Sequence, residues 1–245
     1  MQHVSLLACV VLFAAHGRAA EPTGFIERTW EDASGEYKYS IFVPHSYKSG
    51  THPPVILFLH GVGETGSDGK RPTEAGLGPA ICRREKDFPF LVVFPQAQSN
   101  ALIPIYTWYP YRDDGKRAVA IFDAVTKEFS TDPQRQYLTG VSMGGYGVWA
   151  WAATEPKRWA AIAPICGGGD SAWAPPLKDI PIWCFHGAAD RQVPARTSRV
   201  MIEAIRAAGG KPKYDEFPGV DHNSWDKAYA NDELYRWLLN QSKKD

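Results

Sequence analysis

Short apolar runs recur along this chain, each bounded by polar residues, glycine or proline. Residues 55–59 and 90–94 are continuously apolar, which is typical of strands buried on both faces of a parallel sheet. Residues 37–43 instead alternate bulky and polar side chains, and this alternation predicts a half-exposed strand. Further strand candidates are 136–141, 160–165, 182–185 and 213–217.

Between these runs lie stretches whose apolar residues recur at helical spacing. Gly209-Gly210 gives one of them a typical helix end. Strands that alternate with helices predict an α/β domain, with a mostly parallel central sheet and helices on both faces. Ligands of such sheets bind beyond the carboxyl ends of the strands, so we expect the chemistry there. The helix candidates are 117–129, 146–153, 197–208 and 232–240.

The first twenty residues differ from the rest of the chain. Residues 6–15 form an apolar run of about ten residues, whereas crossing a bilayer takes about 20. Ala19-Ala20 then precede Glu21. We therefore expect a signal peptide at 1–20, a single domain at 21–245, and a secreted or periplasmic protein. A buried first strand or helix is the alternative interpretation of this run.

Charge is balanced over the 245 residues, with 27 Lys and Arg against 27 Asp and Glu. This balance argues against a nucleic-acid-binding protein or a polybasic membrane-surface protein. Loss of residues 1–20 would remove Arg18 and no acid, leaving 26 basic against 27 acidic residues. We therefore expect substrate preference to come from loop aromatics and local shape.

Three cysteines, Cys82, Cys166 and Cys184, lie beyond the predicted signal peptide. No Cys-x-x-Cys pair occurs, so the sequence offers neither a zinc ribbon nor a thioredoxin-type motif, and we expect no metal and no cofactor. Cys166 and Cys184 fall in apolar strand candidates, which favours buried free thiols. A single disulfide among the three is the alternative in an oxidising compartment.

The segment Gly140-Val141-Ser142-Met143-Gly144 matches the pattern G-x-S-x-G. A strand candidate precedes it and a helix candidate follows it. The turn between them must be sharp and its flanking residues small, which lifts the Ser142 hydroxyl clear of the sheet. A serine hydroxyl needs an adjacent base to act as a nucleophile.

His222, in the loop after the last strand candidate, is the favoured base because an imidazole both takes and returns a proton near neutral pH. Asp190 follows the strand candidate 182–185 and is the favoured partner of His222. Asp170 is its rival, while Asp221 is too close to His222 in sequence to pair with it readily. The other histidines compete poorly; His60 and His186 each precede a glycine at a strand end and are interpreted as structural.

These residues resemble the α/β-hydrolase superfamily, in which nucleophile, acid and histidine follow one another in this order. The resemblance implies a Ser142–His222–Asp190 triad and an oxyanion hole formed by the backbone N–H groups of Val62 and Met143. The segments 76–80, 137–145, 163–169 and 218–225 further resemble secreted bacterial esterases related to polyhydroxybutyrate depolymerases, feruloyl esterases and prolyl-oligopeptidase-like catalytic domains.

Only residues 166–180 separate two strand candidates where many lipases insert a lid. We therefore expect no lid domain and an open, shallow site that favours soluble esters. Aromatic side chains in nearby loops offer flat walls for a sugar or a phenolic acyl group. Loop packing is an equal alternative for Trp225 and the favoured interpretation for the other aromatics, and Glu64 could instead hold its own loop. The candidates for substrate contact are Trp108, Trp173, Trp225 and Glu64.

The expected function is that of a serine carboxylesterase acting through an acyl-enzyme on a small-molecule or oligosaccharide ester, with acyl or feruloyl esters of plant polysaccharide included. Cleavage of peptides, thioesters or polyesters on the same triad is the first alternative. A catalytically silent binding protein is the second, since a fold does not determine a function. No nucleic acid or membrane partner is expected, and the sequence leaves the oligomeric state open.

Overall fold

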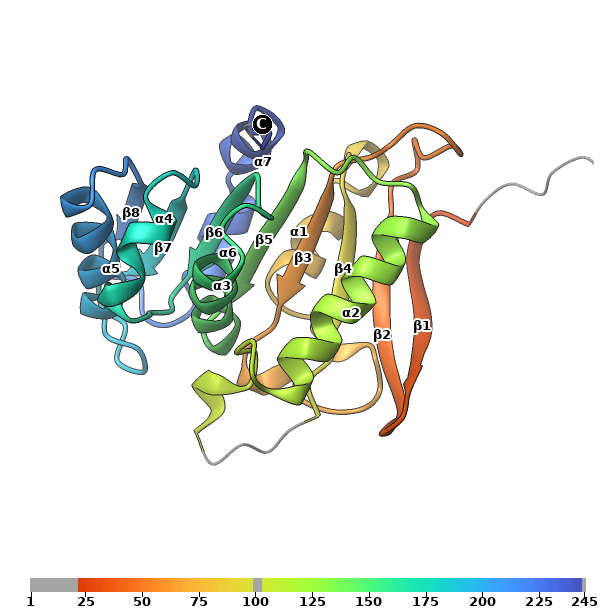
Figure 1. Cartoon of the computed structure of the whole chain (residues 1–245), viewed down its shortest axis with the longest axis horizontal. Coiled ribbons are helices and arrows are strands. Elements are labelled where there is room, and N and C mark those ends of the chain that lie inside the picture. The colour runs from red at the N-terminus through yellow and green to blue at the C-terminus, as the bar shows by residue number, and fades with distance from the viewer. Residues whose placement is uncertain (1–21, 99–102, 244–245) are drawn as a thin grey trace, which may run out of the picture.

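One eight-stranded sheet runs through the part of the protein that the computed structural model describes, residues 22–98 and 103–243 (Figure 1). The strand order is β1-β2-β4-β3-β5-β6-β7-β8; β2 pairs antiparallel with β1 and β4, and the other pairs are parallel. The strands are β1 (Gly24–Asp32), β2 (Gly35–Val43), β3 (Val55–Leu59), β4 (Leu91–Pro95), β5 (Gln136–Val141), β6 (Ala161–Ile165), β7 (Trp183–Gly187) and β8 (Lys213–Phe217). The predicted signal peptide, 1–20, lies outside the described residues.

Helices cover both faces of the sheet, as the strand and helix pattern predicted (Figure 1). Each face has its own apolar core, and the side chains of β3 alternate between the two cores: Val55, Leu57 and Leu59 face one, Ile56 and Phe58 the other. The first core is covered by α2 (Asp113–Glu128), α3 (Met143–Thr154), α4 (Ala174–Leu177) and α5 (Arg196–Ala207), and the second by α1 (Leu77–Cys82), α6 (Trp225–Ala230) and α7 (Asp232–Leu239).

Two features of the antiparallel end of the sheet differ from the sequence-based expectation. The prediction of a half-exposed strand at 37–43 is wrong for its second half, because Tyr39–Val43 are all buried between β1 and β4. The edge strand β1 was not predicted, since its apolar residues are interrupted by charged ones and its side chains are mostly half-buried or exposed. Its nine-residue register with β2 comes from the hairpin and not from an apolar run.

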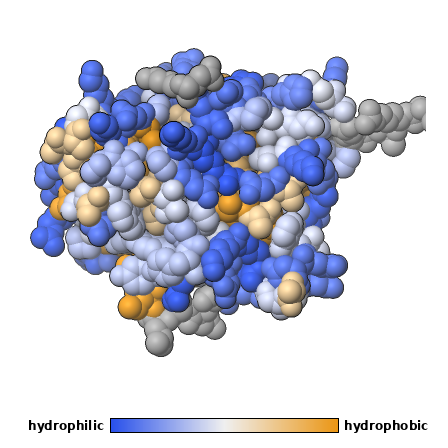
Figure 2. Space-filling model, viewed as in Figure 1, coloured by the Kyte–Doolittle hydropathy of each residue, from blue (hydrophilic) through white to orange (hydrophobic). Residues whose placement is uncertain are grey.

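No lid domain occurs among residues 22–98 and 103–243, as expected. Between β6 and β7 the chain forms only a single 3-10 turn, η5 (Ser171–Trp173), followed by the four-residue helix α4. The carboxyl ends of β5, β6 and β7 therefore meet at an edge that no inserted domain covers. On the face seen in Figure 2, apolar residues gather only in small separate patches, as is ordinary for a folded domain.

All three cysteines in the described part of the chain carry free thiols, with Cys166 and Cys184 buried and Cys82 exposed. Burial raises the pKa of both buried thiols to about 12, so they are protonated at neutral pH.

The described residues contain no group of three or more His, Cys, Asp or Glu side chains that could hold a metal ion. None of the helices in this part of the chain is long and apolar enough to cross a bilayer.

Candidate active site

Ser142 occupies the sharp turn between β5 and α3. Its backbone has φ 52° and ψ −114°, a conformation that L-residues other than glycine rarely adopt. Neighbouring structure holds the turn: the Ser142 N–H donates to the Ile165 carbonyl at 3.0 Å, and the Tyr146 N–H donates to the Ser142 carbonyl at 3.1 Å. The strained turn places the Ser142 side chain beyond the end of the sheet.

The glycines after Ser142 are required by the close approach of neighbouring strands. A Cβ on Gly144 would lie 1.8 Å from the carbonyl oxygen of Leu59, at the end of β3. A Cβ on Gly145 would lie 2.5 Å from the carbonyl oxygen of Ile165, at the end of β6. The first turn of α3 is thus wedged between two strand ends, which is why the sequence pattern demands small residues there.

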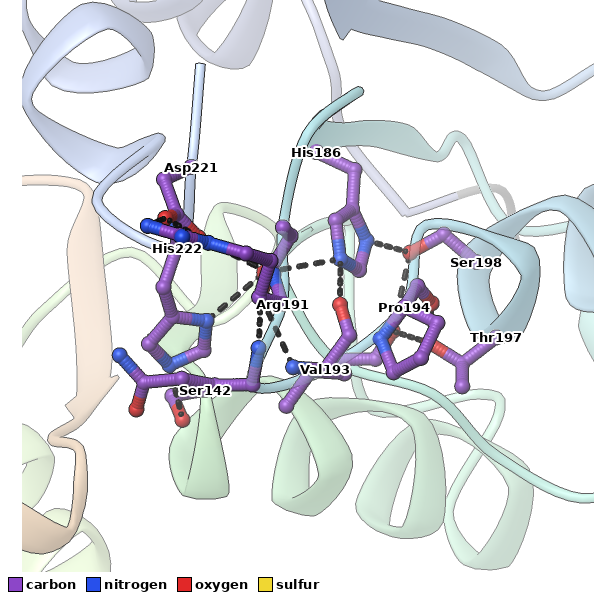
Figure 3. A network of polar contacts seen from close by, with 12 residues as sticks. Ser142, His186, Arg191, Val193, Pro194, Thr197, Ser198, Asp221 and His222 are labelled. Atoms are coloured by element: carbon purple, nitrogen blue, oxygen red, sulfur yellow. Dashed lines mark hydrogen bonds and ion pairs between the residues drawn. The ribbon is translucent and has the colours of Figure 1, made fainter.

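His222 bridges Ser142 and Asp190. Its Nε2 lies 2.9 Å from Ser142 Oγ, and its Nδ1 lies 2.7 Å from Asp190 Oδ2 (Figure 3). Because a carboxylate only accepts, Nδ1 carries the proton that it donates to Asp190. Nε2 is then the free lone pair and accepts the Ser142 hydroxyl proton. The structure therefore brings together the three residues that the chain order suggested.

Asp190, and not its rival Asp170, faces the histidine. Its side chain is fully buried, and its Oδ1 accepts the N–H groups of Gln192 at 2.9 Å and Val193 at 2.8 Å. Asp170 is exposed and caps the η5 turn by accepting the Ala172 N–H at 2.9 Å. These backbone donors fix the Asp190 carboxyl beside His222 and away from solvent.

A second imidazole, which the sequence interpretation set aside as structural, reaches the same carboxylate. His186 Nε2 lies 3.3 Å from Asp190 Oδ2, and neither side chain is exposed. The only signal in the sequence is the spacing of four residues between His186 and Asp190 across the end of β7. This contact depends on the turn after the strand, so the strand pattern alone could not reveal it.

Asp221 links the loop that carries Asp190 to the loop that carries His222. Its Oδ1 accepts the N–H groups of Arg191 at 3.0 Å and His222 at 2.9 Å, and its Oδ2 accepts the Arg191 guanidinium at 2.8 and 2.6 Å (Figure 3). The Arg191 backbone N–H, then its side chain, lowers the pKa of Asp221. The Asp221 carboxylate that joins the two loops is therefore charged at neutral pH.

We expect Asp221→Ala to lower kcat about 3–10-fold on any ester that the protein cleaves, because His222 loses a backbone anchor and its ring is less firmly placed. Arg191→Ala is the matched control. It removes an 87% exposed side chain but leaves the backbone N–H bonds of Asp221 intact, so it should change kcat less. Steady-state kinetics of the two variants measure the loss of kcat in each. Equal losses would show that the ion pair between the Asp221 and Arg191 side chains, and not the backbone bonds of Asp221, places His222.

The loop after β3 is held by a buried neutral histidine. His60 Nε2 accepts the Ala97 N–H at 3.0 Å, so the proton lies on Nδ1, which donates to the Gly61 carbonyl at 2.6 Å. Burial lowers the pKa of His60 to about 4, which keeps the ring neutral.

Directly after Gly61, Val62 begins the 3-10 turn η1 (Val62–Glu64), just as Met143 begins α3. Both N–H groups stand at the start of a helix, where the helix offers them no partner.

Glu64 closes η1 and is half-buried. Burial raises the pKa of its carboxyl, while the nearby backbone N–H groups of Gly61 and Glu64 oppose that shift. A Cβ on Gly61 would lie 3.2 Å from Glu64 Oε2, so the carboxyl folds back over its own loop. This contact places Glu64 against its own loop, in agreement with the interpretation that it holds that loop.

The three tryptophans suggested as substrate contacts have different surroundings. The prediction for Trp108 is wrong: its side chain is fully buried, its indole N–H donates to the His60 carbonyl at 2.9 Å, and its ring packs edge-on against that of His60. Trp225 is half-buried with its ring 5.5 Å from the His222 ring, edge to face. Trp173 is half-buried against Tyr109, with ring centroids 5.9 Å apart.

Trp173 lines a cavity of about 320 Å³ along α3. Two of its lining residues, Ala150 and Thr154, are four residues apart on α3 and are neighbours on the surface of that helix. At 1.5 Å per residue, these two positions lie about 12 and 18 Å from Ser142 along the helix axis. Its lining residues are Tyr109, Pro110, Tyr111, Ala150, Thr154 and Trp173.

Both the sequence and the fold are similar to those of known esterases. The sequence matches the family described as "Putative esterase" over residues 31–203. A solved structure, "Crystal Structure of a Thermostable Esterase", is 34% identical with a TM-score of 0.80, covering 89% of this chain and 63% of that one.

Among curated proteins, poly(3-hydroxyalkanoate) depolymerase C of Paucimonas lemoignei is 34% identical over 122 residues, which cover 47% of this chain and 28% of that enzyme. Carboxylesterase SOBER1 of Arabidopsis thaliana is 24% identical over 204 residues, covering 69% of this chain and 82% of that protein. The chain therefore spans less than a third of the depolymerase and less than two thirds of the thermostable esterase.

Proposed function

Because this chain belongs to the esterase family, we propose that it is a serine carboxylesterase that cleaves esters by two-step acyl transfer. The observation that carries the proposal is the continuous hydrogen-bonded chain from Ser142 Oγ through His222 to Asp190, at 2.9 and 2.7 Å. The backbone strain at Ser142 supports it, because strain of this kind gathers at functional turns.

In the first step, Ser142 Oγ attacks the ester carbonyl while His222 Nε2 takes the hydroxyl proton. The carbon–oxygen bond to the alcohol then breaks, and the alcohol leaves with that proton. In the second step His222 takes a proton from water, the hydroxide attacks the acyl-Ser142 ester, and the acid leaves as Ser142 regains its proton. Asp190 remains charged throughout and stabilises the imidazolium.

The amides of Val62 and Met143 are proposed to hold the oxyanion of both tetrahedral intermediates. The Met143 N–H begins the 12-residue helix α3 and lies at the positive end of its dipole, while the Val62 N–H begins the 3-10 turn η1. Removing one donor of this kind typically costs about 3–4 kcal/mol of transition-state stabilisation. Since these are backbone groups, His60 and Gly144 determine their placement, through the Gly61 carbonyl and the packing of α3.

The proposed substrates are soluble esters, with acyl or feruloyl esters of an oligosaccharide as the finer proposal. The uncovered edge of the sheet supports access by hydrophilic esters. The aromatic cavity along α3 is too far from Ser142 for a short acyl group but suits a sugar unit further along the alcohol. Aromatic rings pack against the C–H faces of sugars, and the hydroxyls of Tyr109 and Tyr111 offer hydrogen bonds.

We expect Trp173→Ala to lower kcat/KM at least about 5-fold on an acylated xylo-oligosaccharide, which corresponds to about 1 kcal/mol of ring contact. Hydrolysis of p-nitrophenyl acetate, which does not reach the cavity, should stay within two-fold of wild type. Val200→Ala, which trims an exposed apolar residue of α5 outside this cavity, is the control. Equal losses on both substrates would argue against a sugar in the cavity.

The test of the proposed function combines a probe with a substrate panel. A fluorophosphonate should label Ser142 in the folded protein, and no labelling would contradict the enzyme and favour a silent binding protein. Rates on acetyl, butyryl and feruloyl esters, a thioester, a polyester and a peptide amide then separate the reaction types. Fastest cleavage of an amide, thioester or polyester would replace the carboxylesterase proposal by that activity.

A secreted or periplasmic location is likewise proposed, on the apolar run at 6–15 and Ala19-Ala20 that follow the pattern of a signal peptide.

A further inference from the structure

The Asp190 carboxylate is shared by two imidazole rings. Its Oδ2 lies 2.7 Å from His222 Nδ1 and 3.3 Å from His186 Nε2, and the dashed contacts from both rings converge in Figure 3. The acyl-transfer steps above give His186 no task. We propose that His186 is a positioning residue that holds the Asp190 carboxylate in the orientation that His222 needs; this rests on the proposed function.

The protons on His186 follow from its neighbours. Nε2 lies 2.9 Å from the Val193 carbonyl, which can only accept, so Nε2 carries the proton and donates it there, with Asp190 Oδ2 3.3 Å from the same nitrogen. Nδ1 lies 2.7 Å from Ser198 Oγ. Burial lowers the pKa of His186, so the ring is neutral at pH 7 and Nδ1 accepts the Ser198 hydroxyl proton.

The single hydroxyl proton of Ser198 has two acceptors within reach, the Gly167 carbonyl at 2.9 Å and His186 Nδ1 at 2.7 Å. The Gly167 carbonyl, 2.9 Å from Ser198 Oγ, also accepts the Thr197 hydroxyl at 3.0 Å. The protonated thiol of Cys184 lies 3.4 Å from Ser198 Oγ and donates to it. Ser198 on one side and the Val193 carbonyl on the other therefore hold the His186 ring with its Nε2 toward Asp190.

With His186 in place, both oxygens of the Asp190 carboxylate have two N–H groups beside them. The N–H groups of Gln192 and Val193 donate to Oδ1, His222 donates to Oδ2, and His186 Nε2–H lies 3.3 Å from Oδ2. Loss of His186 would leave Oδ2 with His222 alone and free to rotate toward it. The hydrogen bond to a protonated His222 would then strengthen, while the alignment of His222 with Ser142 would loosen.

The other titratable groups around His186 are Cys184 on its own strand and Glu216 on β8, which pairs with it in register. Cys184 is a neutral thiol at neutral pH. The Arg199 guanidinium holds the pKa of Glu216 at about 2, so Glu216 keeps its charge at neutral and mildly acidic pH. A change in the acidic limb of the pH profile therefore reports on the contact between Asp190 and the two histidines.

The test compares His186→Asn with His186→Gln. The Asn amide nitrogen falls near the position of Nδ1 and faces Ser198, whereas the Gln amide nitrogen falls near Nε2 and can donate to Asp190. We expect Asn to lower kcat about 10–100-fold with KM within two-fold, and to move the acidic limb of kcat/KM to higher pH. The Gln variant should retain kcat within about 3-fold of wild type, and the acidic limb of its kcat/KM profile should lie at the wild-type pH.

Both variants are measured with p-nitrophenyl acetate, and their folded fraction is counted by fluorophosphonate labelling. If the Asn and Gln variants lower kcat equally, or if the acidic limb of kcat/KM shifts in neither variant, His186 merely packs and the proposal is overturned. If Asn unfolds while Gln is folded and has lost activity or shifted its limb, the proposal is likewise overturned. A wild-type protein that neither hydrolyses esters nor reacts with the probe contradicts the proposed function instead.

Discussion

Ser142→Ala is expected to lower kcat about 10⁴-fold or more, because no other group in the proposed site can form the acyl-enzyme. The residual rate would come from the oxyanion donors and from substrate binding, which the substitution leaves in place. Alanine keeps the strained backbone at φ 52°, so the melting temperature should change little. Steady-state kinetics and thermal unfolding of the same preparation measure both quantities.

Ser142→Gly is the matched variant for this prediction. It should be as inactive as Ser142→Ala, but glycine relieves about 1–3 kcal/mol of backbone strain at this position. The greater freedom of glycine in the unfolded chain offsets about 0.5–1 kcal/mol of that gain. We expect Ser142→Gly to melt about 2–4 °C above Ser142→Ala. Turnover by either variant above about one hundredth of wild type would contradict the role of Ser142.

Gly144→Ala is expected to destabilise the fold by about 3 kcal/mol or more. The added Cβ would lie 1.8 Å from the Leu59 carbonyl oxygen and 2.9 Å from that of His60, and both are backbone atoms that cannot swing aside. Either α3 or the end of β3 must move, and each carries one of the proposed oxyanion donors. For a domain of this size the melting temperature should fall about 6–12 °C, with a loss of activity in the protein that stays folded.

Gly63→Ala is the control for Gly144→Ala. It lies in the loop after β3, but a Cβ there would meet nothing within 4 Å, and its φ is negative. Its melting temperature should stay within about 2 °C of wild type. This control concerns stability alone. Activity is measured only for Gly144→Ala, where the rate per probe-labelled Ser142 is compared with that of wild type. A wild-type melting temperature for Gly144→Ala would mean that the turn is looser than the close approach implies.

Local patterns in the sequence were enough for the architecture and for the nucleophile. The continuous apolar run of β3 and the helical spacing of apolar residues in α2 and α5 directly reflect which side chains face a core, so the sequence predicted both. The sequence predicted the G-x-S-x-G turn because its small residues are required locally, by the close approach of α3 to two strand ends.

Tertiary structure decided the contacts between residues far apart in the chain. Asp190 and Asp170 both follow strands in sequence, and only the order β6-β7-β8 and the path of the last loop bring Asp190 to His222, 32 residues away. Trp108 was a plausible substrate contact in a loop, but folding buries it against His60, 48 residues earlier. Burial of β2 and the reach of His186 to Asp190 depend in the same way on neighbours. Periodicity records how one segment meets a core, whereas strand order and loop path determine which distant side chains meet each other.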